Sequence, residues 1–272
     1  MVDAVRKSGL PVDAYELPSD ALPGRIEQLA RSGVRRVAVA GGDGTISTAA
    51  GVTSRVAIEL AILPGGTLNH LADDLGIPDS LEKALNMAIR GEARAVDAGS
   101  VNGQLFLNTS AVGTYATFVR IRDRLEGDLG YRLASVAAAI RLLVRPYVFT
   151  VEVEIEGQMR FDITPLVFVG VGERELKLPT LGGRARDGRR GLHLMIVRGR
   201  SRARFAALAF AAAARGTRSA ARSPALEAFL VRQFTIRLRR PRGVIATDGE
   251  LHTMMAPLEY RWVPDAVRIV TP

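Results

Sequence analysis

The chain has 272 residues, of which 47% are hydrophobic, and its 37 Lys and Arg outnumber 28 Asp and Glu to give a net charge of +9. This size and composition are typical of a globular protein with one large or two small domains. The absence of cysteine excludes disulfides, cysteine-ligated metals and thiol nucleophiles. No segment has the features of a secretory leader or approaches the roughly 20 apolar residues of a membrane-spanning helix, so we expect a cytoplasmic protein.

The first third of the chain alternates strand and helix patterns. This alternation predicts a parallel sheet with helices on its faces. The expected strands are Val12–Leu17, Val34–Ala40 and Ala57–Leu63, and the expected helices are Ala21–Ser32, Ile46–Thr53 and Ser80–Arg90.

Short alternating runs replace this pattern from about Ala95 and predict a mainly antiparallel β-sandwich. We therefore expect an α/β domain over residues 1–95 and a β-rich domain over 96–264, with a last strand in 265–272 that could return to the first domain. Two helices are expected in the second part, at Leu133–Val144 and Ala203–Arg215. The expected strands are Ser100–Asn108, Thr150–Glu156, Gln158–Ile163, Leu166–Val171, Leu192–Arg198, Phe234–Leu238, Gly243–Thr247 and Pro257–Trp262.

A glycine-rich turn follows the strand expected to end at Ala40. Its sequence is Gly41-Gly42-Asp43-Gly44-Thr45, and a helix-compatible run follows it. Glycines let a backbone approach a ligand that a Cβ would block, and the first amides of a helix favour an anion. The single carboxylate of Asp43 would repel phosphate unless a cation lay between them, which points to Mg²⁺–nucleotide chemistry.

A second polar turn follows the next strand, where Gly65, Gly66, Thr67 and Asn69 offer amides, a hydroxyl and a carboxamide. Ligands of open α/β sheets bind beyond the carboxyl ends of the strands, so two such turns can form one site. The alternative is a pair of ordinary strand-to-helix turns.

Four motifs occur in order along the chain: GGDGT at 41–45, PGGTLNHLADDLGIP at 64–78, a D-x-G-x-x-N-G segment from Asp97, and Thr247-Asp-Gly-Glu250. Together they resemble the diacylglycerol kinase catalytic-domain family, which includes bacterial lipid kinases and sphingosine kinases. The resemblance runs from about Gly33 to the end. It implies a Rossmann-like, NAD-kinase-like nucleotide domain, a β-sandwich-like lipid domain, and transfer of the γ-phosphate of ATP to a lipid hydroxyl, most simply that of diacylglycerol to give phosphatidic acid.

The resemblance also implies roles for individual residues. Asp43 would act with a phosphate-bound Mg²⁺, and Glu250 would be the base that accepts the hydroxyl proton. For Asp248 and Glu250 the alternative is a tight hairpin turn, which Asp-Gly strongly favours. The nucleotide phosphates would be bound by Gly41, Gly42, Asp43, Gly44, Thr45, Ile46, Ser47, Gly65, Gly66, Thr67 and Asn69.

The family places a structural Mg²⁺ near Asp187, but this chain departs from the pattern there. Arg189, Arg190 and Gly191 stand between Asp187 and Leu192, and these arginines disfavour a cation. A second departure is the Glu173-Arg174 pair, which stands where many relatives have asparagine.

A third departure is at the N-terminus, where the family's first strand and its N-P-x-S/A-G turn are not found. Two alternatives to an active lipid kinase follow: a phosphotransferase of the NAD kinase type, or a truncated chain that binds nucleotide or lipid without catalysis. The edge strand that a missing neighbour would expose predicts a homodimer.

The basic charge predicts a polyanionic partner. An anionic membrane fits, because each basic residue near the bilayer surface gains about 1 kcal/mol, and a solvated arginine-rich face is the alternative. Nucleic acid is disfavoured, since the basic stretches lack the interleaved aromatics that stack on bases. We therefore expect peripheral association with membranes, where the lipid substrate would be bound.

Overall fold

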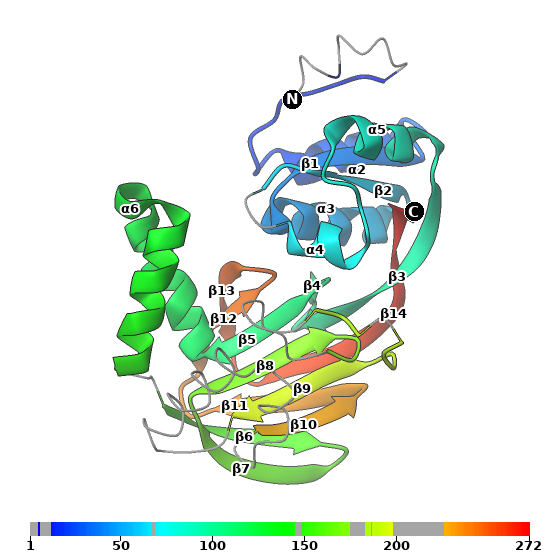
Figure 1. Cartoon of the computed structure of the whole chain (residues 1–272). Coiled ribbons are helices and arrows are strands. Elements are labelled where there is room, and N and C mark those ends of the chain that lie inside the picture. Colours follow the sequence, from blue (N-terminus) through cyan, green and yellow to red (C-terminus); the bar gives the residue numbers. More distant parts are fainter. Residues whose placement is uncertain are drawn as a thin grey trace.

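Helices and parallel strands alternate in the N-terminal part of the computed structural model (Figure 1). The structure describes residues 5, 12–66, 69–144, 148–174, 183–185, 187–197 and 226–272. The N-terminal elements are α2 (Leu22–Arg31), β1 (Arg36–Gly41), α3 (Asp43–Val56), β2 (Glu59–Pro64), α4 (His70–Asp74) and α5 (Leu81–Arg90).

Helices cover both faces of this part of the sheet. β1 and β2 run parallel, with Val39 opposite Ile62. Ile26 of α2 and Ile46 of α3 are buried against one face, while Ala84 of α5 is buried against the other. Because apolar residues of the helices meet the sheet on both sides, the strands between them are buried, as expected for a parallel α/β arrangement.

Antiparallel strands dominate the rest of the chain. The elements are β3 (Glu92–Val101), β4 (Gln104–Phe106), β5 (Thr109–Gly113), α6 (Thr114–Val144), β6 (Phe149–Ile155), β7 (Gln158–Thr164), β8 (Leu166–Val171), β9 (Leu192–Val197), β10 (Leu226–Val231), β11 (Gln233–Leu238), β12 (Arg242–Thr247), β13 (Glu250–Met255) and β14 (Leu258–Thr271).

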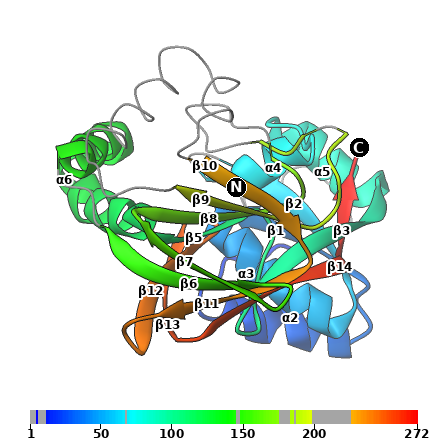
Figure 2. The ribbon, with the colours of Figure 1, turned by 90° about the horizontal axis from the view of Figure 1, so that it is seen from below.

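These strands form two sheets that enclose a common core (Figure 2). One sheet has the order β10-β9-β8-β5-β12-β13, and the other continues β1-β2-β14 into β11-β6-β7. Val153 and Ile236 from the second sheet pack with Val169, Leu194 and Ile245 from the first in one buried cluster. The predicted fold class, an α/β part followed by an antiparallel β-sandwich, is confirmed.

The last strand joins the two parts of the molecule. β14 lies antiparallel to β11 at its start, where Tyr260 faces Phe234, and parallel to β2 near its end, where Ile269 faces Leu60. It pairs with β3 along almost its whole length, with a register shift between Val263 and Val267. The division at residue 95 remains a prediction, because β3 and β14 run through both parts as a paired ribbon.

Three predicted elements differ from the structure. The strand expected at Val12–Leu17 is wrong: residues 12–18 have no regular structure, and Val12 and Leu17 are exposed rather than packed on a sheet. The single strand expected at Ser100–Asn108 is wrong because Asn102 and Gly103, both with positive φ, turn the chain from β3 into β4.

The helix expected at Leu133–Val144 is the second half of α6. The first half of α6 begins at Thr114. Gly130, with φ 72° and ψ 160°, interrupts the helix between the two halves. The strands β5, β10 and β13 were not predicted, and the helix expected at Ala203–Arg215 lies outside the described residues.

Candidate functional site

The two glycine turns touch each other at the carboxyl ends of β1 and β2. The Gly65 N–H donates to the Gly41 carbonyl at 3.2 Å. A Cβ placed on Gly66 would lie 2.5 Å from the Gly42 Cα, closer than any real Cβ contact allows. Only glycine therefore fits at this crossing, and the backbones of both turns reach the same side of the sheet.

Helix α3 begins immediately after the first turn. Gly42 is its N-cap and has no side chain to cap it, and the Ile46 N–H makes the first bond of the helix, to the Gly42 carbonyl at 3.1 Å. The N–H groups of Asp43, Gly44 and Thr45 precede that bond and so have no acceptor within the helix. Such a terminus carries the positive end of the helix dipole and is suited to phosphate.

Two polar side chains expected at the ligand instead stabilise the turns. The Asp43 Oδ1 accepts the Leu71 N–H at 3.1 Å in the first turn of α4. The Asn69 Oδ1 accepts the Gly66 N–H at 2.8 Å. These bonds hold the second turn and α4 against the head of α3, so Asp43 connects the two turns whatever else it binds.

Three other residues of the predicted phosphate site differ in how they are placed. Thr45 packs its side chain over Gly41. Ile46 is buried in the core, so only its backbone could reach a ligand. Thr67 lies outside the described residues.

Asp248 connects α3 to the second part of the chain. Its carboxylate is fully buried and accepts four hydrogen bonds. The Ser47 hydroxyl and the Leu107 N–H donate to Oδ2 at 2.8 and 2.7 Å, and the N–H groups of Asn108 and Thr109 donate to Oδ1, both at 2.9 Å. Burial raises the pKa of Asp248, and the four donors oppose that rise.

Ser47 has a structural contact that was not expected, and its role at a phosphate remains a prediction. Its hydroxyl donates its proton to Asp248. The three amides of Leu107, Asn108 and Thr109 were not predicted. They lie shortly after the D-x-G-x-x-N-G motif that begins at Asp97, and the motif did not reveal that they bind Asp248.

The hairpin that contains Asp248 also places Glu250 next to α3. Thr247 faces Glu250 across β12 and β13, and Asp248 and Gly249 between them have φ values of 48° and 87°, as in a type I′ turn. The tight hairpin expected as the alternative is therefore present. It also places the Glu250 carboxylate against Gly44, where a methyl group built on Gly44 would overlap that carboxylate.

Two arginines that were not predicted as site residues line the same region, the buried Arg174 and the partly buried Arg184. Arg174 pairs with Asp74 at 3.1 Å and donates to the Asn108 carbonyl at 2.7 Å, and burial lowers the pKa of Arg174 to about 10. Arg184 donates to the Leu107 carbonyl at 2.7 Å. The segment whose amides bind Asp248 thus has its carbonyls bound by guanidinium groups.

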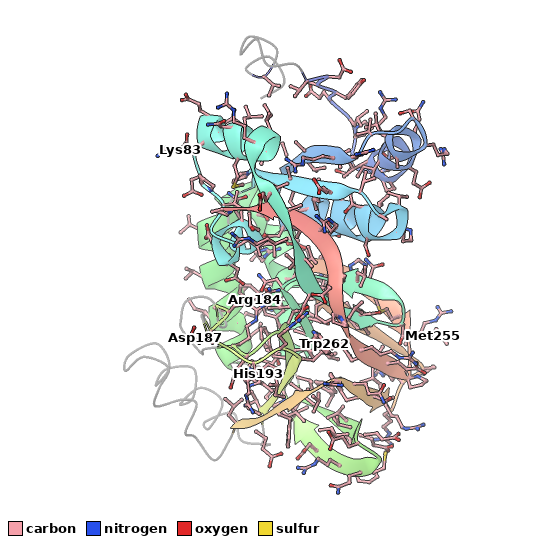
Figure 3. The ribbon with its side chains drawn as sticks, turned by 90° about the vertical axis from the view of Figure 1, so that its right-hand side faces the viewer. Lys83, Arg184, Asp187, His193, Met255 and Trp262 are labelled. Carbon is pink, nitrogen blue, oxygen red and sulfur yellow. The ribbon has the colours of Figure 1, made fainter. Side chains whose placement is uncertain are left out.

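The loop at Asp187 does not fit a cation. Asp187 is exposed, and no group of three or more His, Asp or Glu within the described ranges could hold a metal ion. Figure 3 shows Asp187 and Arg184 near the level where β14 passes between the two parts. The charges beside Asp187 are positive, since Arg189 and Arg190 follow it.

These two arginines pair with carboxylates. Arg190 bonds Asp97 through Nε at 2.9 Å and Asp265 at 2.7 Å, and Arg189 bonds both oxygens of Glu173 at 3.2 Å. Burial acts against ionisation of Asp97, but Arg190 and the Asp265 N–H together hold its pKa below the usual range. Guanidinium groups therefore supply the positive charge at this loop.

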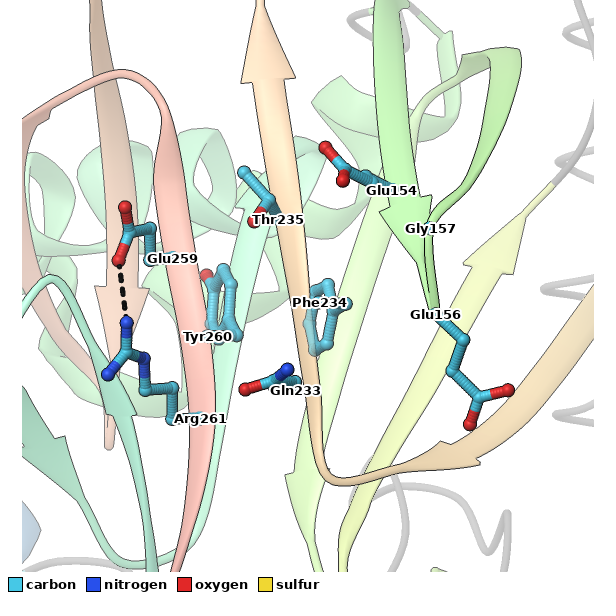
Figure 4. Close-up of a pocket in the computed structure, with 9 residues that line it drawn as sticks. All are labelled: Glu154, Glu156, Gly157, Gln233, Phe234, Thr235, Glu259, Tyr260 and Arg261. Atoms are coloured by element: carbon cyan, nitrogen blue, oxygen red, sulfur yellow. Dashed lines mark hydrogen bonds and ion pairs between the residues drawn. The ribbon is translucent and has the colours of Figure 1, made fainter.

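A shallow pocket of about 250 Å³ lies elsewhere, on the solvent side of β6, β11 and β14 (Figure 4). Glu154, Thr235 and Glu259 face one another across these strands, and Glu259 pairs with Arg261 at 3.2 Å. None of the predicted site residues lines this pocket.

The sequence was compared with known families and proteins. Residues 3–101 match the diacylglycerol kinase catalytic domain. The chain is 41% identical over 124 residues to "Probable lipid kinase YegS-like" of Enterobacter sp. (strain 638) and 38% identical over 126 residues to "Lipid kinase YegS" of Escherichia coli (strain K12). Each match covers 44% of this chain and 41% of the relative, so the chain is matched over about two-fifths of the length of these proteins.

Two crystal structures of proteins from Bacillus anthracis str. Sterne share the fold. One is titled as a diacylglycerol kinase and has a TM-score of 0.65 at 20% identity; the match covers 95% of this chain and 83% of that protein. Another has a TM-score of 0.71 at 22% identity, with coverages of 95% and 85%. The family match confirms the predicted resemblance over residues 3–101, which contain the first two motifs and most of the third, and these structures confirm the fold.

The Asp248 contacts predict a large loss of stability in Asp248→Asn. An asparagine amide would direct N–H groups at donors that need an acceptor, so the free energy of unfolding should fall by about 2–4 kcal/mol. Ser47→Ala leaves three of the four donors in place and should cost about 1–2 kcal/mol. Urea denaturation measures both, and an Asp248→Asn variant as stable as the wild type would contradict the role given to this carboxylate.

The arginine pairs predict that the Asp187 loop is insensitive to chelators. EDTA should leave the thermal midpoint of the wild type unchanged, whereas Asp97→Ala should lower the free energy of unfolding by about 1 kcal/mol by removing the acceptor of Arg190 and of the Asp265 N–H. Glu173→Ala is the matched control and should change little, because its ion pair is exposed. A midpoint that falls with EDTA and is restored by Mg²⁺ would show that a cation holds the loop.

Proposed function

We propose that this chain is an ATP-dependent lipid kinase that transfers the γ-phosphate to a lipid hydroxyl, with diacylglycerol as the simplest acceptor and phosphatidic acid as the product. The match of residues 3–101 to the diacylglycerol kinase catalytic domain and the names of the curated relatives support this proposal. The observation that carries it is the contact of the Glu250 carboxylate with Gly44 in the first turn of α3.

The head of α3 would bind the nucleotide phosphates. The N–H groups of Gly44 and Thr45 lie at the positive end of the helix, and the close Gly42–Gly66 crossing leaves no room for a side chain at those two glycines. Bound together with ATP, Mg²⁺ would supply positive charge that neutralises the phosphates. The carboxylate of Asp43 lies at this helix terminus and would hold the ion.

Glu250 would then act as the general base. A lipid hydroxyl that approaches the Glu250 carboxylate beside the α3 terminus lies next to both the proton acceptor and the phosphate. Its proton passes to Glu250, its oxygen forms the new bond to the γ-phosphorus, and the bond from that phosphorus to ADP breaks. Asp248 is a positioning residue in this scheme, because it fastens the hairpin that carries Glu250 to Ser47 of α3.

Substitution of the base tests the role of Glu250. Glu250→Gln keeps the size of the side chain and removes its basicity, so kcat should fall by about 10²- to 10⁴-fold while the KM for ATP and the thermal midpoint change little. Transfer of labelled γ-phosphate from ATP into lipid in mixed micelles provides the measurement. Turnover at the wild-type rate would exclude Glu250 as the base.

The role of Asp43 requires a variant that keeps the cap on α4. Asp43→Asn retains an oxygen for the Leu71 N–H but removes the charge that would bind Mg²⁺. We expect loss of transfer with little change in the thermal midpoint. If Asp43→Asn is fully active, the charge of Asp43 has no part in catalysis.

Two glycine-to-alanine substitutions test the contact between the Glu250 carboxylate and Gly44. A methyl group at Gly44 would displace the Glu250 carboxylate, so Gly44→Ala should lower kcat by roughly 10- to 100-fold. Gly51 lies in the same helix with open space around its Cα, and Gly51→Ala should leave kcat unchanged and stabilise the protein by about 0.5–1 kcal/mol. Equal kcat values for the two variants would contradict the proposed placement of the base.

The same assay separates the alternatives. Label in NAD rather than in lipid would favour a phosphotransferase of the NAD kinase type. Binding of ATP without transfer to either acceptor would favour a chain that binds nucleotide without catalysis.

A further inference from the structure

The second half of α6 is apolar on two opposite faces. Ala134, Ala138 and Leu142 recur every fourth residue and are buried. On the other side, Leu133, Val136 and Ile140 are 63%, 55% and 57% exposed. A helix that is apolar on two opposite faces normally packs against other surfaces on both of them, so the exposed stripe is expected to contact a further apolar surface.

The position of α6 leaves this stripe accessible. Both ribbon views place α6 at the edge of the molecule, beside the sheets (Figures 1 and 2). Leu129, just before the interruption at Gly130, is also exposed, at 44%. Four large apolar side chains are therefore presented to the surroundings by one helical segment, which is an unusual concentration of exposed apolar side chains.

The charge of the segment favours one kind of occupant. Residues 130–150 contain three arginines and no Asp or Glu, and Arg141 is exposed next to Ile140. Apolar side chains flanked by arginine are typical of helices that lie in the interface of an anionic bilayer. A second copy of this chain is a poorer occupant, because two segments of the same positive charge would repel each other.

The helix is suited to lie on a bilayer rather than to cross it. Residues 131–144 extend about 21 Å as a helix, which is short of the roughly 30 Å of a hydrocarbon core. In the described part of the chain, no helix is long and apolar enough to span a membrane.

The first half of α6 connects this stripe to the candidate site. Ala116 and Val119 pack with Ala246 of β12, and Leu251 of β13 lies against the same cluster. These strands form the hairpin that carries Asp248 and Glu250. A bilayer bound by the second half of α6 would therefore lie beside the element that holds the proposed base.

We propose that the stripe formed by Leu133, Val136 and Ile140, with Arg141 beside it, docks the protein on anionic membrane surfaces. This inference rests on the proposed function, since a lipid kinase must reach an acceptor held in a bilayer, and it assigns that contact to the second half of α6.

Vesicle binding tests the proposal. The triple variant Leu133→Ser, Val136→Ser, Ile140→Ser should bind sedimented vesicles of 60% phosphatidylcholine and 40% phosphatidylglycerol at least tenfold more weakly than the wild type, with an unchanged circular dichroism spectrum. The matched control is Met159→Ser, Phe161→Ser on β7, where the two side chains are 42% and 68% exposed, and it should bind like the wild type. The wild type should bind vesicles of pure phosphatidylcholine more weakly than the anionic vesicles. Arg141→Glu should reduce this difference in affinity between the two kinds of vesicle.

A labelling experiment keeps the proposal testable if the triple variant does not fold. The chain has no cysteine, so Ile140→Cys and Phe161→Cys can each carry a single polarity-sensitive fluorophore. The emission of the label at 140 should shift to the blue on the anionic vesicles, and that at 161 should not. The proposal is overturned if the wild type does not bind vesicles, if both labels respond alike, or if the triple variant instead abolishes a dimer seen without vesicles.

The outcome can be separated from that of the kinase proposal. Transfer to a water-soluble short-chain diacylglycerol needs no membrane, so the triple variant should retain wild-type turnover on that acceptor. Vesicle binding without any transfer would contradict the kinase proposal alone. Transfer without vesicle binding would contradict the docking proposal alone.

Discussion

One buried carboxylate determines how the candidate site is assembled. A charged group away from water is tolerated only when donors surround it. Asp248 has four donors, one from α3 and three from the consecutive amides that lead from β4 into the start of β5. These donors come from parts of the chain far apart in sequence, so satisfying this carboxylate fixes α3, the β12–β13 hairpin and the start of the sandwich in one arrangement. The position of Glu250 at the head of α3 follows from that arrangement.

Glycines in the two turns allow close approach of neighbouring segments at the same site. Gly42 and Gly66 meet at the crossing of the two turns, and Gly44 leaves the space that the Glu250 carboxylate occupies. The site is therefore formed by the glycine-rich terminus of α3, with the Glu250 carboxylate placed against it from the other part of the chain. The long pair of strands β3 and β14, which runs through both parts, supports this junction with a continuous sheet.

Local patterns in the sequence predicted much of the fold but little of the contact network. The helices α2, α3 and α5 and the glycine turns have strong local signals, and the family motifs identified the turn that carries Glu250. The strand expected at Val12–Leu17 failed because alternation alone does not supply a neighbouring strand. The four donors of Asp248, the inward arginines Arg174 and Arg184, and the arginine pairs near Asp187 depend on contacts between distant segments, which a single sequence does not reveal. A helix was predicted at Leu133–Val144, but its exposed apolar stripe was not, because the sequence does not show which of two apolar faces is covered.

A structure with bound Mg²⁺ and a non-hydrolysable ATP analogue tests the central claim most directly. The account predicts phosphate oxygens about 3 Å from the N–H groups of Gly44 and Thr45, with the γ-phosphate beside the Glu250 carboxylate and the four bonds of Asp248 intact. A nucleotide bound elsewhere, or a γ-phosphate out of reach of Glu250, would contradict it.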